Sequence, residues 1–134
     1  MRVIDIEFVK LVGIKQSQNE LSLAYKKDVL NHIQTIHASA QFTLAETASG
    51  LCLKESFPDI LDVVPLLRDS SIKYKKPALK EIVAFATISD EDKESFLKQF
   101  KRKSRATINV SVEIKDSDGV CTAEGIFRWF ISKI

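Results

Sequence analysis

Charged residues are nearly absent from one long stretch of the sequence, residues 33–53. The stretch has 21 residues and one formal charge, that of Glu46. Because 28% of the chain is charged, a segment of this length would be expected to hold about six such residues. Small and aliphatic side chains recur in it at spacings of four, four and three, at Ala40, Leu44, Ala48 and Leu51. This helical periodicity predicts a helix from Ala38 to about Leu53.

The same stretch is too polar to cross a membrane. A membrane-spanning helix needs roughly 20 consecutive and mostly apolar residues. Several side chains here are polar instead: Gln34, Thr35, His37, Ser39, Gln41, Thr43, Thr47 and Ser49. We therefore expect a helix buried inside the protein and no membrane span. The first ten residues include Asp5 and Glu7 and lack a long apolar core, so they do not resemble a signal peptide.

The composition is typical of one ordinary globular domain. The chain has 134 residues, of which 45% are apolar, and 20 basic against 18 acidic residues give a net charge of +2. A chain this close to neutral lacks the strong basic excess that is typical of nucleic-acid binding. The sequence contains no linker-like segment and no internal repeat, so we expect a single domain over residues 1–134.

The two cysteines, Cys52 and Cys121, lie far apart in the sequence. Neither has the Cys or His neighbours that zinc sites and redox motifs require, so we expect no metal ligands. We expect both to be reduced thiols in a cytoplasmic protein.

The segment before the predicted helix contains two candidate strands. Phe8 to Ile14 is apolar and rich in β-branched residues, and Glu20 to Tyr25 alternates between apolar and polar side chains. The polar residues Gln16 to Asn19 between them predict a hairpin turn.

The segment after the predicted helix contains further strands. Alternating side chains predict strands over Ser71 to Lys75, Glu81 to Ile88 and Thr107 to Ile114, and a closing strand over Val120 to Ile131. The dipeptide Asp118-Gly119 predicts a hairpin turn before the closing strand.

A short helix is predicted between these late strands. Ser89 and Asp92 have the spacing of a helix N-cap, and the apolar residues that follow are Phe96, Leu97 and Phe100. The order of elements predicts an α+β domain in which one antiparallel sheet covers a central helix. Such a sheet has a second face to hide or solvate, which favours dimerisation.

Glu46 carries the one formal charge in residues 33–53. An ionised carboxylate is costly to bury. Either Glu46 pairs with a backbone group, a basic residue or solvent at one edge, or it lies where the fold opens to a ligand. Asn31 lies six residues before His37, which in turn lies nine residues before Glu46. A carboxylate, an imidazole and an amide grouped in this way favour a functional site.

Residues 31–50 resemble the signature of hotdog-fold thioesterases. The family commonly has the pattern N-x-x-G-x-x-H-G-G-x-x-x-x-L-A-D/E-x-x-x-G. The corresponding residues here are Asn31, Gln34, His37, Ala38, Ser39, Leu44, Ala45, Glu46 and Gly50. Residues 72–78 are similar to the third strand of the family and its exit. Within the superfamily, the chain resembles the phenylacetate-pathway type and an uncharacterised thioesterase-like type. The resemblance implies a hotdog fold, in which an antiparallel sheet wraps around a central α-helix.

The resemblance also implies roles for these residues. Glu46 would act as a general base that activates water. The backbone N–H groups of Ala38 and Ser39, at the start of the helix, would bind the developing oxyanion. Asn31 and His37 would position the thioester.

The chain departs from the family pattern at three glycines. Gln34 replaces one of them, and Ala38-Ser39 replaces a Gly-Gly pair. Only backbone N–H groups are needed to bind the carbonyl, so Ala38 and Ser39 can supply them, although a Cβ narrows the approach. Further substrate contacts are expected at Gln34, Phe42, Tyr74 and Lys75. Phe42 is also expected to pack in the core.

Helix geometry predicts that the site is built from two chains. Residues nine apart on a helix point in opposite directions and lie about 13 Å apart along its axis. His37 and Glu46 of one chain therefore cannot meet at one substrate atom. We expect Glu46 of one subunit to face the helix start of another, as the family's dimers imply, in a homodimer or a dimer of dimers.

Two local clusters of basic residues have two interpretations. The first cluster is Lys73, Lys75 and Lys76, and the second is Lys101, Arg102, Lys103 and Arg105. Both can be solvated surface, with the second complementing the dipole at a helix C-terminus. Alternatively, one of them binds the phosphates of coenzyme A.

The sequence leaves three functions open. The first is a thioesterase acting on acyl-CoA or acyl-carrier-protein substrates, with no cofactor because coenzyme A is part of the substrate. The second is a hotdog protein that binds an acyl chain or acyl-CoA without turnover, which the replaced glycines favour. The third, a dehydratase acting on 3-hydroxyacyl thioesters, fits less well because the motif is that of thioesterases.

Overall fold

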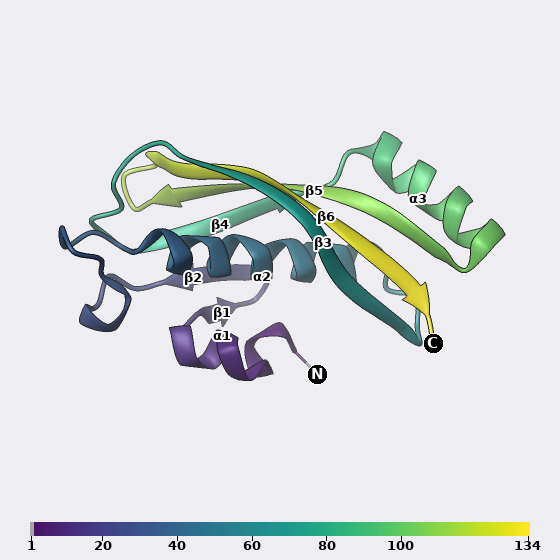
Figure 1. Cartoon of the computed structure of the whole chain (residues 1–134), viewed down its shortest axis with the longest axis horizontal. Coiled ribbons are helices and arrows are strands. Elements are labelled where there is room, and N and C mark those ends of the chain that lie inside the picture. Colours follow the sequence, from purple (N-terminus) through teal and green to yellow (C-terminus); the bar gives the residue numbers. More distant parts are fainter. Residues whose placement is uncertain (1) are drawn as a thin grey trace.

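A computed structural model describes residues 2–134 and shows one antiparallel sheet curled around one long helix (Figure 1). The helices are α1 (Glu7–Val12), α2 (Ala38–Ser56) and α3 (Asp90–Lys103). The strands are β1 (Lys15–Ser17), β2 (Glu20–Leu23), β3 (Val63–Tyr74), β4 (Ile82–Thr87), β5 (Arg105–Asp116) and β6 (Cys121–Lys133). They pair in the order β1-β2-β4-β5-β6-β3. This is the expected α+β architecture.

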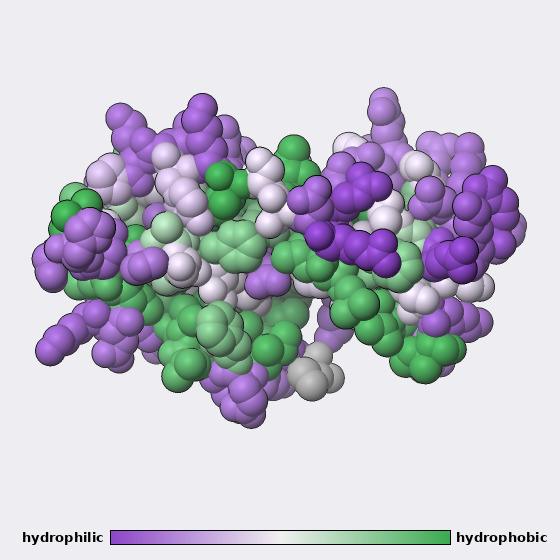
Figure 2. Space-filling model, in the orientation of Figure 1, coloured by the Kyte–Doolittle hydropathy of each residue, from purple (hydrophilic) through white to green (hydrophobic). Residues whose placement is uncertain are grey.

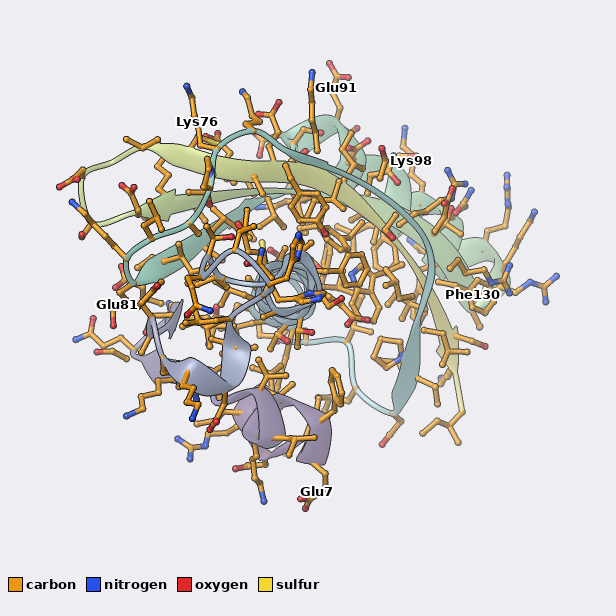
Figure 3. All side chains as sticks on the ribbon, turned by 60° about the vertical axis from the view of Figure 1, so that its left-hand side comes forward. Glu7, Lys76, Glu81, Glu91, Lys98 and Phe130 are labelled. Atoms are coloured by element: carbon orange, nitrogen blue, oxygen red, sulfur yellow. The ribbon has the colours of Figure 1, made fainter. Side chains whose placement is uncertain are left out.

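The charge-poor stretch forms α2, the central helix. It begins at Ala38 as predicted and continues to Ser56, three residues beyond the predicted end. The four positions that carried the periodicity are all buried. Figure 3 looks almost along α2 and shows the sheet arching over it, with α1 below. None of the helices in residues 2–134 combines the length and apolar character that crossing a membrane requires.

The core lies between α2 and the inner face of the sheet. Leu44 of α2, Val110 of β5 and Phe127 of β6 are completely buried. Phe42 packs its ring 5.4 Å from that of Phe127 and remains partly exposed. The expectation that Phe42 contributes to the core is therefore confirmed.

The prediction of a strand over Phe8 to Ile14 is wrong. The chain forms the helix α1 there, and Gly13 ends it in the left-handed conformation, with φ of 91°. The reason is tertiary packing: Val9 is buried beneath α2, whereas Phe8 and Leu11 are exposed. The apolar run therefore contributes one face of a helix. A hairpin turn is present within the predicted residues, at Gln18-Asn19, but its first strand is β1, which includes Gln16 and Ser17 of the predicted turn.

The strand predicted over Ser71 to Lys75 is longer and begins earlier. β3 runs from Val63 to Tyr74 and includes Pro65. It lies at the edge of the sheet, paired only with β6. An edge strand accommodates proline because one row of its N–H groups needs no partner strand. Because proline usually argues against a strand, Pro65 prevented the first half of β3 from being predicted.

The late elements follow the prediction closely. Ser89 caps α3, its Oγ accepting a hydrogen bond from the Asp92 N–H at 3.1 Å. Phe96 is buried as expected, but Leu97 is 47% exposed, which corrects its assignment to the apolar face. Gly119, with φ of 80°, forms the predicted turn between β5 and β6.

Candidate functional site

Glu46 lies near the middle of α2 and is half-buried. Its carboxylate makes no hydrogen bond or ion pair with any residue among 2–134. Burial raises the pKa of the Glu46 carboxyl above its ordinary value. A carboxylate without a partner in a poorly solvated place has the properties of a general base.

A stripe of partly exposed residues runs along this side of α2. From Ala40 to Leu51 every residue is buried except Phe42, Glu46 and Gly50. These three are spaced by four residues, so they lie on one side of the helix. Gly50 adds no side chain next to the carboxylate. The stripe is therefore the line along which a ligand can approach Glu46.

Trp129 of β6 supports the C-terminal end of this stripe. Its Nε1 donates a hydrogen bond to Ser49 Oγ at 2.9 Å, and Ser49 Oγ donates to the Glu46 carbonyl at 2.7 Å. These bonds fix α2 against β6 beside Gly50. Spacing alone does not predict the Trp129–Ser49 bond, because the two residues are 80 positions apart in the sequence.

The start of α2 carries one available backbone donor. The Ser39 N–H donates to His37 Nδ1 at 2.9 Å, so His37 acts as the N-cap of the helix. The Ala38 N–H has no partner among the residues that the structure describes. Ala38 is exposed. Of the two predicted oxyanion donors, Ala38 is available and Ser39 is occupied by His37.

Tyr74 holds the same helix start from the end of β3. Its hydroxyl donates to the Ala38 carbonyl at 3.1 Å. Burial raises the pKa of the Tyr74 hydroxyl, which favours the protonated donor. Lys75 follows directly, and its Nζ lies 3.5 Å from Glu124 Oε1. Tyr74 therefore contacts the start of α2, and Lys75 is the next residue along the chain.

Asn31 shapes the loop that leads into α2. Its Oδ1 accepts hydrogen bonds from the N–H groups of Ile33 and Thr35, both at 3.0 Å. Its Nδ2 donates to Thr35 Oγ1 at 2.7 Å. The side chain is engaged within the loop, so Asn31 positions the backbone around the helix start.

Gln34 adopts a left-handed backbone conformation, with φ of 65°. Glycine enters this region without penalty, whereas other L-residues pay a steric cost. This explains why the resembling motif has glycine at this place. The Gln34 carbonyl accepts a hydrogen bond from the Tyr25 hydroxyl at 2.6 Å, which holds the turn in place. Residue spacing does not predict this bond, because Tyr25 and Gln34 are nine positions apart in a loop region.

One chain does not bring Glu46 and the helix start together. Ala38 and Glu46 are eight residues apart on α2, about 12 Å along the helix axis. The helix start lies at the Tyr74 end of the sheet, whereas the C-terminal end of α2 lies near α3, where Phe57 packs 4.7 Å from Phe96. The two halves of the predicted site are separated in one subunit.

The two basic clusters lie at opposite ends of the molecule. Lys73, Lys75 and Lys76 surround the end of β3 near the start of α2. Residues 101–105 lie at the end of α3, which Figure 1 places at the other end of the sheet. Within one chain, only the first cluster is close to the Ala38 N–H. Residues 2–134 contain no group of three or more His, Cys, Asp or Glu side chains arranged for a metal ion.

Comparisons with known proteins agree with this architecture. The model of the family described as Domain of unknown function (DUF4442) matches residues 5–131. No curated protein matches the chain. A protein of unknown function from Pseudomonas aeruginosa is similar in structure, with 21% identity, a TM-score of 0.81, and coverage of 99% of this chain and 93% of that one.

Two further solved structures are informative. A Bacillus halodurans protein, solved with CoA, is 21% identical, with a TM-score of 0.72 and coverage of 97% and 85% of the two chains. A thioesterase from Haemophilus influenzae is 13% identical, with a TM-score of 0.74 and coverage of 98% and 86%. The fold is therefore the hotdog fold that the motif implied.

Proposed function

The chain belongs to the DUF4442 family, and we propose that it is a hydrolase of acyl-CoA or acyl-carrier-protein thioesters whose site is built from two subunits. The observation that carries this proposal is the Glu46 carboxylate, half-buried and unpartnered on the central helix of a hotdog fold. The similarity to a thioesterase and to a CoA-bound protein supports the substrate class.

Thioester hydrolysis requires an activated water and a donor for the oxyanion. Poor solvation raises the basicity of Glu46, so the carboxylate takes a proton from water as the water attacks the carbonyl carbon. The negative charge that develops on the carbonyl oxygen is stabilised by the Ala38 N–H and by the positive end of the α2 dipole. When this intermediate collapses, the C–S bond breaks, and the departing sulfur takes the proton held by Glu46 and leaves as the free thiol. His37 and Asn31 hold this helix start in place.

A second copy of the chain would complete the site. β3 has twelve residues and lies at one edge of the sheet, and a long free edge is a ready template for pairing with another strand. Figure 2 shows apolar residues spread from the region of α1 to that of β3 on the same side of the molecule. Phe8 and Leu11 of α1 are 59% and 79% exposed. Such a surface favours a protein partner.

The test is release of free thiol from a panel of acyl-CoAs of different chain length. Glu46→Gln keeps the size of the side chain and removes the base, so turnover should fall by about 100-fold or more. Glu55→Gln, the same change at an exposed position of α2, is the matched control and should leave turnover unchanged. Equal turnover of the Glu46→Gln and wild-type proteins would contradict the proposal.

The second candidate is an acyl-CoA-binding protein without turnover. The hydrogen bond from the Ser39 N–H to His37 favours it, because this bond leaves one helix-start donor where the family motif suggests two. Thermal-shift measurements with the same acyl-CoAs separate the two functions. Stabilisation without thiol release would select the binding protein.

A further inference from the structure

Four of the five arginines of the chain gather on one side of the molecule. They are Arg68 in β3, Arg102 in α3, Arg105 in β5 and Arg128 in β6. Elsewhere the basic side chains are lysines, apart from Arg2 at the N-terminal end. Arginine differs from lysine in having a planar, bidentate donor that also stacks on rings. The concentration of arginine here indicates a surface suited to bidentate hydrogen bonds and to stacking on rings.

The sheet register places three of these arginines on the outer face, away from α2. Along β5, Arg105 alternates with residues whose side chains fill the core, such as Ala106 and Ile108. Arg128 is paired with Asn109, and Phe130, two residues further along β6, is paired with Thr107. Arg68 lies at the irregularity in β3 between Leu67 and Asp69. The residues therefore surround one point of the outer face.

Phe130 lies at the centre of this group. The guanidinium carbon of Arg68 lies 4.0 Å from the centroid of the Phe130 ring. This cation–π contact places the guanidinium over the ring. Arg68 is exposed, so solvent reaches its guanidinium. In Figure 3, Phe130 lies on the far side of the β3 and β6 ribbons from α2.

The other arginines keep most of their donors available. Arg128 Nη2 donates to Thr107 Oγ1 at 3.2 Å, which orients the side chain. None of the four arginines forms an ion pair with any acid among residues 2–134. Arg105 lies two residues before Thr107 on the same face. Unpaired guanidinium groups, of which Arg68 and Arg128 are oriented by these contacts, are suited to phosphate oxygens.

A hollow runs between α3 and this face. It has a volume of about 240 Å³ and is lined by residues that include Asp92, Gln99, Asn109 and Arg128. Gln99 Oε1 accepts a hydrogen bond from the Thr107 N–H at 3.2 Å and ties α3 to the face. A second hollow of about 450 Å³ along α3 shares Gln99 and includes Arg102. Together they provide space of the size that small ligands occupy. The hollows are of mixed charge, because Asp92 lines the first and Glu91 and Glu94 line the second.

We propose that this face binds a phosphorylated nucleotide. The base stacks on the exposed side of the Arg68 guanidinium, which Phe130 supports from behind, as guanidinium planes stack on bases elsewhere. Arg105 and Arg128 donate hydrogen bonds to the phosphate oxygens, and Arg102 reaches them from α3. The face is separated from Glu46 by the sheet itself. The nucleotide is either free or the adenosine-phosphate end of a CoA thioester.

Binding of ADP, measured by calorimetry, tests the proposal. Wild-type protein should bind ADP saturably and more tightly than inorganic pyrophosphate, which lacks a base. Arg68→Ala and Arg128→Ala should each weaken ADP binding about tenfold or more, since the first removes the group that stacks on the base and the second removes a charge-assisted contact with phosphate. Arg68→Lys keeps the charge but loses the planar surface, so it should weaken ADP binding and leave pyrophosphate binding nearly unchanged.

Arg2→Ala is the matched control, because Arg2 is the arginine outside the group. It should bind ADP like the wild type, and all variants should keep the wild-type melting temperature. No saturable binding of ADP, or equal losses in Arg2→Ala and Arg128→Ala, would overturn the proposal. Equal affinities for ADP and pyrophosphate would also overturn it, since they exclude a contact with the base.

Competition with acyl-CoA distinguishes the two sources of nucleotide. If the site takes a free nucleotide, ADP leaves the KM for acyl-CoA unchanged. If it takes the end of a CoA thioester, adenosine 3′,5′-bisphosphate competes with acyl-CoA and Arg128→Ala raises the KM. Nucleotide affinity of the Glu46→Gln protein should equal that of the wild type. A failure of nucleotide binding is thus separate from a failure of hydrolysis.

Discussion

At the scale of single residues, two positions are energetically unfavourable in the folded state, and the rest of the structure compensates for them. Glu46 holds a half-buried carboxylate without a partner, and Gln34 holds a left-handed backbone conformation. Both lie within residues 31–50, the segment that resembles the thioesterase signature. Proteins commonly keep such costs at functional sites. Substitutions at each of the two positions should therefore change the free energy of unfolding.

Glu46→Gln should stabilise the protein at neutral pH. Because burial raises the pKa of Glu46 in the folded state, the folded protein holds this proton more tightly than the unfolded chain does. The stabilising contribution of the protonated carboxyl is therefore complete below the ordinary pKa of 4.5 and is lost as the pH rises through the raised folded value.

The measurement is urea unfolding of both proteins between pH 3.5 and pH 8. The variant should be more stable than the wild type at pH 7 and indistinguishable from it at the acidic end. Glu55→Gln, at an exposed position, should show no such pH dependence. A Glu46→Gln protein that is less stable than the wild type at pH 7 would mean that the carboxylate has a favourable partner in solution.

Gln34→Gly should raise the free energy of unfolding by about 0.5–1 kcal/mol. Removing Cβ relieves the left-handed strain of roughly 1–2 kcal/mol, and the greater entropy of the unfolded glycine offsets part of that gain. Gln34→Val should lower the free energy of unfolding, because a β-branched side chain is disfavoured in the left-handed conformation. Chemical denaturation checks both changes, and a destabilising glycine would show that the Gln34 side chain has contacts that outweigh the strain.

At the scale of elements, alanine substitutions at two glycines, one in α2 and one in β6, should change stability in opposite directions. Gly50 lies inside α2, and a Cβ there would lie at an ordinary distance of 3.5 Å from the Trp129 ring. Gly50→Ala should therefore gain about 0.5–1 kcal/mol of stability from helix propensity. Gly125 lies in β6, where a Cβ would lie 2.6 Å from the Ser71 carbonyl oxygen of β3.

Gly125→Ala should consequently cost about 1–3 kcal/mol, because the backbones of β3 and β6 must move apart. Thermal unfolding of the two alanine variants measures the contrast. If both variants had the same stability, the close approach of β3 to β6 at Gly125 would be excluded.

The elements also show which structural facts the sequence can predict. α2, β5 and the turn at Asp118-Gly119 were predictable because periodicity and turn chemistry are local properties. α1 was not, because its apolar run fits a strand equally well until packing against α2 selects one face. The first half of β3 was concealed by Pro65, whose tolerance depends on the strand being at the edge. The sequence therefore predicts the elements that depend on neighbouring residues, and it does not predict those that depend on tertiary packing.

The same division applies to the candidate site. Glu46 stood out because a lone charge in an apolar stretch is visible in the sequence. The bond from Ser39 to His37, which removes one of the two predicted oxyanion donors, depends on how the His37 ring turns at the helix start. Trp129 and Tyr74 reach α2 from distant strands, so their hydrogen bonds to this helix are visible only in the folded chain, although Tyr74 itself was expected to contact substrate.

At the scale of the whole molecule, the proposed function requires more than one chain. Glu46 and the Ala38 N–H lie on one helix about 12 Å apart along its axis, too far to act on one carbonyl group. In the proposed dimer, the long free edge of β3 would be the surface that meets the second copy. We therefore propose that each active site combines Glu46 of one subunit with the helix start of another.

Ala38→Pro isolates the contribution of the helix start. Proline removes the Ala38 N–H, yet the first helical position tolerates proline well, and His37 already has the extended backbone that a residue before proline favours. Turnover should fall by about 100-fold while the melting temperature stays close to that of the wild type. An active Ala38→Pro enzyme would exclude this N–H as the oxyanion donor.

Mixing the two inactive variants tests the two-chain site directly. Ala38→Pro and Glu46→Gln proteins are unfolded together and refolded at equal amounts, so that half of the dimers contain one of each. Every mixed dimer then holds one intact site, with Glu46 from one subunit and Ala38 from the other, and thiol release should return to about a quarter of the wild-type rate. A mixture as inactive as its two components would contradict a site shared between subunits.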